Sequence, residues 1–99
     1  MYQYLAILDF EATCEKDTTD HEIIEFPTVI IDLKTNTIID RFEQFVKPKE
    51  RVLLSDFCKN LTSITQEQVD SGIPLSDALT RHASFMSKYP NNIFATCSD

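Results

Sequence analysis

Residue types that many functional sites require are scarce in this sequence of 99 residues. Its single glycine, Gly72, excludes the glycine-rich loops that cradle phosphate groups in nucleotide-binding proteins. Lys and Arg number 9 against 16 Asp and Glu, and the net charge of −7 excludes a generally basic surface that coats nucleic acid. No stretch approaches the roughly 18 continuous apolar residues of a membrane span, and the N-terminus lacks the basic start of a signal peptide. We therefore expect no membrane partner.

The cysteines are few and unsuited to cross-linking. Cys14, Cys58 and Cys97 are an odd number, and no two of them form a C-x-x-C pair. This spacing disfavours both a disulfide framework and a structural zinc site. We expect three free thiols that serve as small core residues, no disulfide-linked partner, and an intracellular protein of the cytoplasm or the nucleus. The sequence leaves the oligomeric state open.

What is present is enough for one folded domain with several strands. Apolar residues make up 42% of the chain, which suffices for a core. The continuous apolar run over residues 4–8 predicts a strand buried on both faces of a sheet. Residues 22–33 and 38–46, rich in β-branched side chains and joined by a turn, predict an antiparallel pair. Pro27 is expected at a sheet edge or a bulge, because proline cannot donate to the ladder.

The second half of the chain has helical periodicity. Thr65 and Gln68 have the spacing of a capping box, and Gly72 can close the short helix that follows. Pro74 suits the first position of a longer helix. The apolar positions of that helix recur at spacings of three and four: Leu75, Ala78, Leu79, Ala83, Met86 and Tyr89. A fourth strand over residues 93–97 should return parallel to the first. This order predicts an α/β fold.

Two carboxylates mark the end of the first strand. Asp9 and Glu11 lie two residues apart, and such residues point to the same face of a strand. Open α/β sheets bind ligands at the carboxyl ends of their strands. Close carboxylates repel unless a proton or a cation neutralises them, and Mg²⁺ prefers carboxylate oxygens. Taken alone, such a pair is common and more often begins a solvated loop than marks a metal site.

The residues around this pair resemble a known family. Asp9-Phe10-Glu11-Ala12-Thr13-Cys14-Glu15 is similar to the first motif of the DEDDh (DnaQ-like) 3′→5′ exonucleases, and most similar to the histone-mRNA 3′-end, or enhanced-RNAi, exoribonuclease subfamily. Residues 22–27, 54–58, 61–65 and 69–70 resemble further segments of that subfamily in the same order. Thr96-Cys97-Ser98-Asp99 resembles the second motif, in which an aspartate follows the fourth strand. The resemblance covers almost the whole chain.

The resemblance implies a ribonuclease H-like mixed sheet with flanking helices and a 3′→5′ exoribonuclease that uses two Mg²⁺ ions, for which Mn²⁺ can substitute. Its substrate would be RNA 3′ ends, single-stranded or in short overhangs. Asp9 would hold both ions, Glu11 would hold one and orient the attacking water, and Asp99 would hold the other, so that these three are the implied catalytic and metal residues. The implied nucleotide-binding residues are Glu11, Ala12, Leu61, Thr62 and Thr65.

The sequence departs from the family pattern in two ways. Ser63 and Ser98 stand where the family commonly has glycine, and a positive φ at either serine would cost about 1–2 kcal/mol. The family's third motif, a histidine followed five residues later by an aspartate, is absent at His21 and His82. We therefore interpret residues 1–99 as the N-terminal part of a single exonuclease domain, incomplete at its C-terminus. By itself, this chain is expected not to degrade RNA efficiently.

An alternative of another class stays open. Without the third motif, the chain could be a truncated, non-catalytic fragment that binds nucleic acid or a protein partner. A histidine five residues before an aspartate in a longer product would favour the enzyme. The preference for RNA over DNA rests on the resemblance alone.

Other polar residues are weaker candidates. His82 is expected to be a packing residue of the long helix, and His21 to be exposed in a loop. Three of the nine basic residues lie within 47–51, where a solvated loop is favoured over contact with phosphates. Glu25 is equally compatible with a place beside the carboxylate pair and with a solvent-facing position.

Overall fold

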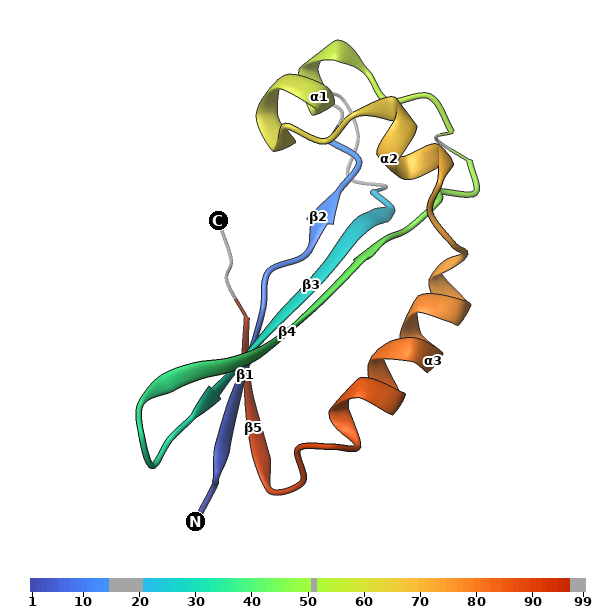
Figure 1. The fold of residues 1–99 in the computed structure, drawn as a ribbon. Coiled ribbons are helices and arrows are strands. Elements are labelled where there is room, and N and C mark those ends of the chain that lie inside the picture. The colour runs from blue at the N-terminus through green and yellow to red at the C-terminus, as the bar shows by residue number, and fades with distance from the viewer. Residues whose placement is uncertain (15–20, 51, 97–99) are drawn as a thin grey trace.

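The computed structural model describes residues 1–14, 21–50 and 52–96. In chain order these form β1 (Tyr4–Leu8), β2 (Glu11–Ala12), β3 (Ile23–Asp32), β4 (Thr37–Phe45), α1 (Asp56–Thr62), α2 (Gln66–Asp70), α3 (Leu75–Met86) and β5 (Asn92–Thr96). Figure 1 shows α3 alongside the sheet and the two short helices together at one end of it. The predicted α/β class, a mixed sheet with flanking helices, is confirmed. Within the described residues, no helix has the length and apolar character that crossing a membrane requires.

The sheet is built around β3, which has neighbours on both sides. β1 pairs antiparallel with β3, from Tyr4 opposite Asp32 to Leu8 opposite Thr28, and β2 continues along the same side. β4 pairs antiparallel with the other side of β3. β5 runs parallel to β1, as predicted, and brings Thr96 opposite Leu8. The carboxyl ends of β1 and β5 therefore lie side by side.

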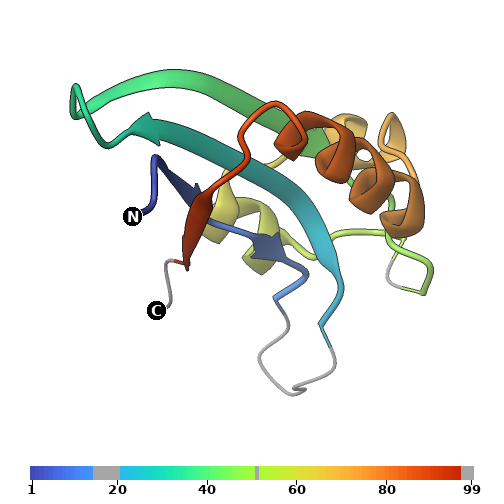
Figure 2. The same ribbon diagram turned by 90° about the horizontal axis from the view of Figure 1, so that it is seen from below.

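The two faces of the sheet are covered unequally. Ala6 and Leu8 of β1 are buried in the core that α3 helps to form, and Figure 2 shows α3 on one side of the sheet. Leu5 and Ile7 point to the other face and are only half-buried. The prediction that residues 4–8 are buried on both faces is therefore wrong for one face, because α3 packs only on the face that Ala6 and Leu8 share.

Pro27 lies in the interior strand, so the prediction of an edge or bulge position is wrong. On the β4 side, Pro27 lies opposite Glu43 within an unbroken stretch of register. On the other side, its carbonyl accepts a hydrogen bond from the Asp9 N–H at 3.4 Å, in the gap between β1 and β2. A residue in a strand presents its N–H and C=O to the same neighbour. The missing N–H of Pro27 therefore faces a part of the chain that is not a strand.

Capping explains where the helices begin. The predicted capping box of α2 is confirmed, since Thr65 Oγ1 accepts from the Gln68 N–H at 3.2 Å and the Gln68 side chain accepts from the Thr65 N–H at 2.9 Å. α1 is not predicted, although Ser55 caps it by accepting from the Cys58 N–H at 3.1 Å. In α3, Pro74 is the N-cap rather than the first helical residue.

Gly72 is required by a close approach of two backbones. A Cβ atom at this position would lie 2.8 Å from the Phe45 carbonyl oxygen and 2.9 Å from the Lys47 nitrogen. The C-cap of α2 is Ser71, and Gly72 does not adopt a positive φ. Gly72 follows the end of α2, as expected, and a glycine is needed there for a steric reason, because α2 ends against β4.

The buried face of α3 runs through a histidine. Ala78, His82 and Met86, spaced by four, are buried, whereas Leu79 is 52% exposed and Ala83 is exposed. The predicted apolar stripe is confirmed at Ala78 and Met86 and is wrong at Leu79 and Ala83. The buried face of α3 includes His82 because aromatic side chains of the sheet surround the imidazole ring.

His82 packs as predicted and is also hydrogen-bonded. Its Nε2 and the Thr28 Oγ1 share a hydrogen bond of 2.8 Å beneath the helix. The imidazole lies against Phe26, with ring centroids 4.5 Å apart, and against Phe42 at 5.2 Å. Burial lowers the pKa of His82. The helix therefore docks on the sheet through a neutral histidine.

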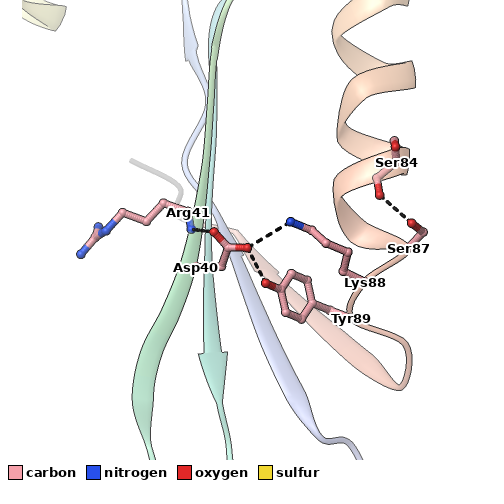
Figure 3. Close-up of polar contacts among 6 residues, drawn as sticks. All are labelled: Asp40, Arg41, Ser84, Ser87, Lys88 and Tyr89. Carbon is pink, nitrogen blue, oxygen red and sulfur yellow. Dashed lines mark hydrogen bonds and ion pairs between the residues drawn. The ribbon is translucent and has the colours of Figure 1, made fainter.

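A polar cluster fixes the C-terminal end of α3 to β4 (Figure 3). The Tyr89 hydroxyl donates to Asp40 Oδ2, and the Lys88 ammonium donates to the same oxygen at 3.3 Å. The Arg41 N–H donates to Asp40 Oδ1 at 2.8 Å. The hydrogen bond to Asp40 raises the pKa of Tyr89 to about 12, and the pKa of Asp40 is lowered mainly by the same bond. This cluster positions the turn from α3 into β5.

Ser63 ends α1 with a φ of 64°, in the left-handed region that favours glycine. We expect Ser63→Gly to raise the free energy of unfolding by about 1 kcal/mol, because it relieves the Cβ strain of that conformation. Ser71→Gly is the matched control, since Ser71 caps α2 with a right-handed φ of −85° and should lose stability. Urea unfolding measures both, and a loss of stability in Ser63→Gly would contradict the assignment.

His82 should make stability depend on pH. Its pKa is lower in the folded chain than the ordinary 6.5, so the unfolded chain binds the proton more readily and stability falls as pH drops below about 6.5. We expect the wild-type chain to lose more stability than His82→Gln between pH 7 and pH 5. His21→Gln, at an exposed histidine, should behave as wild type. Equal pH dependence of wild type and His82→Gln in thermal unfolding would refute this role.

Candidate active site

Asp9 and Glu11 lie on the face of the sheet opposite α3. Phe10, between them, turns its ring onto Phe26 in the core beneath α3, with centroids 4.7 Å apart. The two carboxylates therefore extend from the other face, where Glu11 lies opposite Glu25 of β3. Asp9 is exposed and Glu11 is half-buried. The predicted placement of this pair on one face, at the carboxyl end of β1, agrees with the structure.

Two further carboxylates join the pair from β3 and β4. Burial, a hydrogen bond with Glu43 and the negative charges of Glu43, Glu11 and Asp9 together raise the pKa of Glu25 to about 7. Glu25 thus borders the pair, as one of the two sequence interpretations held. Glu43 was missed, because nothing local in the sequence connects it with Asp9, Glu11 or Glu25.

The donor set suits a hard cation but is not complete within the described residues. Carboxylate oxygens are the ligands that Mg²⁺ prefers, and the repulsion felt at Glu25 is the kind that a bound cation relieves. In residues 1–14, 21–50 and 52–96, no three His, Cys, Asp or Glu side chains are grouped to hold a metal ion. The third implied ligand, Asp99, lies outside the described residues, as does Ser98.

α1 stands beside the carboxylates because it packs on β2. The Cys58 thiol is fully buried and donates to the Ala12 carbonyl at a distance of 3.8 Å. Neither Cys58 nor Cys14 is part of a disulfide, as predicted for these two, and Cys97 lies outside the described residues. The implied nucleotide residues on β2 and at the end of α1 are therefore neighbours in the fold.

The side chains of the implied nucleotide-binding residues on and after α1 differ in exposure and in hydrogen bonding. Leu61 and Thr62 belong to α1 rather than to a loop, and Leu61 is 66% exposed. The Thr62 hydroxyl donates to the Cys58 carbonyl at 2.9 Å, and the Thr65 hydroxyl caps α2. Of the three side chains, Leu61 presents an apolar surface, while both threonine hydroxyls hold the backbone in place.

Neither histidine belongs to the carboxylate group. His82 is buried beneath α3 on the other face of the sheet, and His21 is exposed just before β3. Of the basic run at 47–51, Lys47 and Lys49 line a groove on the α3 side, and Arg51 lies outside the described residues. Neither the two histidines nor Lys47 and Lys49 therefore join the carboxylates.

The family comparison covers most of the chain. The model of the exonuclease family RNase_T matches residues 6–99. ERI1 exoribonuclease 2 of Xenopus laevis is 45% identical over 89 residues, which are 88% of this chain and 13% of the relative. The chain spans between 13% and 31% of the length of the curated relatives that it matches.

Solved nucleases share the fold. The nuclease domain of 3′hExo, described as a DEDDh family member bound to rAMP, aligns with a TM-score of 0.90 and 40% identity, covering 98% of this chain and 52% of that chain. A structure described as 3′-end specific recognition of histone mRNA stem-loop by 3′-exonuclease gives a TM-score of 0.90 and 40% identity, covering 99% and 47%. The mixed sheet with flanking helices is therefore the ribonuclease H-like exonuclease fold.

The carboxylate group should leave a pH signature in the metal-free chain. The pKa of Glu25 is about 7 in the folded chain against an ordinary 4.5, so the folded chain binds the proton more readily and stability falls as pH rises from 4.5 to 7. We expect the stability of Glu25→Gln relative to wild type to be greater at pH 8 than at pH 5, with both proteins measured in EDTA. Glu50→Gln, at an exposed loop position, is the control. An equal difference at both pH values would contradict the shift.

Proposed function

Because the chain belongs to the RNase_T exonuclease family, as the resemblance of its motifs implies, we propose that it contributes the first two carboxylate motifs of a 3′→5′ exoribonuclease domain. The observation that carries the proposal is the placement of Asp9 and Glu11 on one face, at the carboxyl end of β1 and beside β5. Relatives that are named exoribonucleases support RNA as the substrate class.

The carboxylates would act through divalent metal ions. The DEDDh family is metal-dependent, and the carboxylate donors present here fit Mg²⁺ better than a softer metal. We propose that Asp9 holds two Mg²⁺ ions, that Glu11 holds one and orients the attacking water, and that Asp99 holds the other. Two such ions would stabilise the attacking and leaving oxygens at phosphorus. Asp9 is suited to the shared position because it is exposed at the strand end.

The terminal nucleotide would lie between β2 and α1. Ala12 extends β2 next to Glu11, and the exposed Leu61 side chain offers an apolar surface for a base or ribose. The capped backbone around Thr62 and Thr65 would hold that surface at a fixed place. Contact with an RNA 3′ end is thus proposed for a strip next to the metal ligands, and the rAMP-bound relative supports this.

The proposed reaction belongs to a complete exonuclease domain of which residues 1–99 form the N-terminal part. The sequence contains no histidine five residues before an aspartate, the pattern in which the family carries its general base. The chain also covers about half of the solved nuclease domain that it resembles. The role of these residues in that domain is to hold metal and the 3′-terminal nucleotide.

Metal binding by the 99-residue chain tests this role without requiring turnover. We expect Mn²⁺ to bind weakly in a calorimetric titration, because two carboxylates with water make a minimal site. Asp9→Asn and Glu11→Gln should each abolish the heat of binding, whereas Glu50→Gln should leave it unchanged. Binding that survives Asp9→Asn would place the metal elsewhere and refute the assignment.

Activity provides the second readout. In a protein that carries the complete domain, Asp9→Asn should cut the Mg²⁺-dependent shortening of a 5′-labelled RNA from its 3′ end by orders of magnitude while leaving thermal unfolding in EDTA intact. Near-normal trimming by this variant would show that Asp9 is not a metal ligand of the reaction.

A further inference from the structure

A groove of about 500 Å³ lies on the α3 side of the sheet, at the same end as the carboxylates. Its walls come from the start of β3, the segment after β4 and the first turns of α3. We call it the lysine groove and define it by Ile23, Lys47, Lys49, Leu75 and Leu79. This volume falls in the range of ligand-binding pockets, about 300–1,000 Å³.

The two lysines are held by their backbones and not by their side chains. The Lys47 N–H donates to the Ile73 carbonyl at 2.9 Å, and the Lys49 N–H donates to Glu22 Oε1 at 2.9 Å. Pro48, between them, is buried, while both lysines are exposed. Within the described part of the chain, the ion pairs involve Lys59 and Lys88 but neither groove lysine. The structure therefore holds the backbone of both lysines in place and leaves their ammonium groups available to a ligand.

The local charge of the groove is positive in an otherwise acidic protein. The chain has a net charge of −7, yet Glu22 is the one carboxylate among the described residues that line the groove. Glu22 accepts hydrogen bonds from the backbone N–H groups of Lys49 and Glu50, the latter at 3.1 Å, so its charge is engaged by the loop itself. The groove thus selects for an anionic ligand.

The floor of the groove is apolar and partly open to solvent. Leu79 is 52% exposed although it lies on α3 one residue after the buried Ala78. Ile23 and Leu75 are half-buried and pack against the core. A ligand with an apolar surface and regularly placed negative charges fits this groove. Its apolar surface would pack on the floor, and its negative charges would pair with the lysines.

We propose that the lysine groove is a second RNA contact, which binds phosphates of the substrate on Lys47 and Lys49 and a base on the apolar floor. This inference rests on the proposed function. RNA is favoured over an acidic peptide by position: Ile23 in the groove lies opposite Ala12, which directly follows the candidate metal ligand Glu11. A strand whose 3′ end sits at the carboxylates needs a basic contact near this end of the sheet, since most of the surface repels phosphate.

The test is equilibrium binding of fluorescein-labelled U₂₀ and U₃ to the 99-residue chain in EDTA, followed by anisotropy at several salt concentrations. EDTA separates the groove from the proposed metal site, which requires a divalent ion. The variants are Lys47→Ala/Lys49→Ala and Leu79→Ala. Alanine at 47 and 49 keeps the backbone N–H groups that hold the loop, and thermal unfolding checks this. Lys34→Ala/Arg41→Ala removes the same charge outside the groove and is the matched control.

We expect wild-type chain to bind U₂₀ more tightly than U₃. Lys47→Ala/Lys49→Ala should weaken U₂₀ binding about tenfold at low salt and reduce the slope of log K against log salt by about 1.4, since single strands contribute roughly 0.7 per neutralised phosphate. Leu79→Ala should weaken binding without changing the slope, because it removes only apolar contact. The control pair should bind U₂₀ as tightly as wild type.

Two outcomes would overturn the proposal. The first is U₂₀ binding that is absent in wild type or equal in wild type and the Lys47/Lys49 variant. The second is an alternating Glu–Leu peptide that binds wild type, is lost in the lysine variant and is not displaced by U₂₀, which would assign the groove to an acidic protein segment. Failure of the proposed function would show instead as Mn²⁺ binding that survives Asp9→Asn, a result that the lysine variants do not affect.

Discussion

The pairing of β3 on both of its sides is the constraint on which the rest of the molecule depends. Its register with β1 and β2 sets Glu25 beside Glu11 on one face, and it turns Thr28 to the other face, where His82 of α3 meets it. Its register with β4 fixes where Asp40 meets Tyr89, at the turn that leads into β5. Helix docking and site geometry thus follow from one strand, because its alternate residues serve opposite faces.

On the carboxylate face, the negative charges proposed to bind metal also lower the stability of the metal-free chain. Burial and the negative charges of Glu43, Glu11 and Asp9 raise the pKa of Glu25, and this is the cost of bringing these carboxylates near one another. A cation would relieve this repulsion, so binding of metal and stability of the folded chain should be linked. When no cation is bound, protonation of Glu25 and its hydrogen bond with Glu43 relieve part of this repulsion.

At the end of the sheet where β2 lies, the two faces carry the two contacts that we propose for a nucleic acid. On one face, carboxylates and the exposed Leu61 of α1 are suited to metal and to a terminal nucleotide. On the other, Lys47 and Lys49 stand over an apolar floor. The proposed RNA substrate is a polyanion, and the overall charge of −7 opposes its approach, so the attraction would have to be concentrated at a few places. A basic groove close to the acidic site meets that need.

The sequence by itself determined the four longer strands, the capping box at Thr65 and the Asp9–Glu11 pair, because each depends on neighbours within a few residues. The tertiary structure alone decided which distant residues join that pair. The register of β3 with β4 shifts by one residue at Ile30, and without this shift Glu43 would lie opposite Phe26 and face α3. Likewise, the need for a glycine where α2 ends against β4 and the existence of the lysine groove follow from segments that meet only in the folded chain. Local periodicity carries no information on contacts between distant segments, because strand register and packing decide which segments touch.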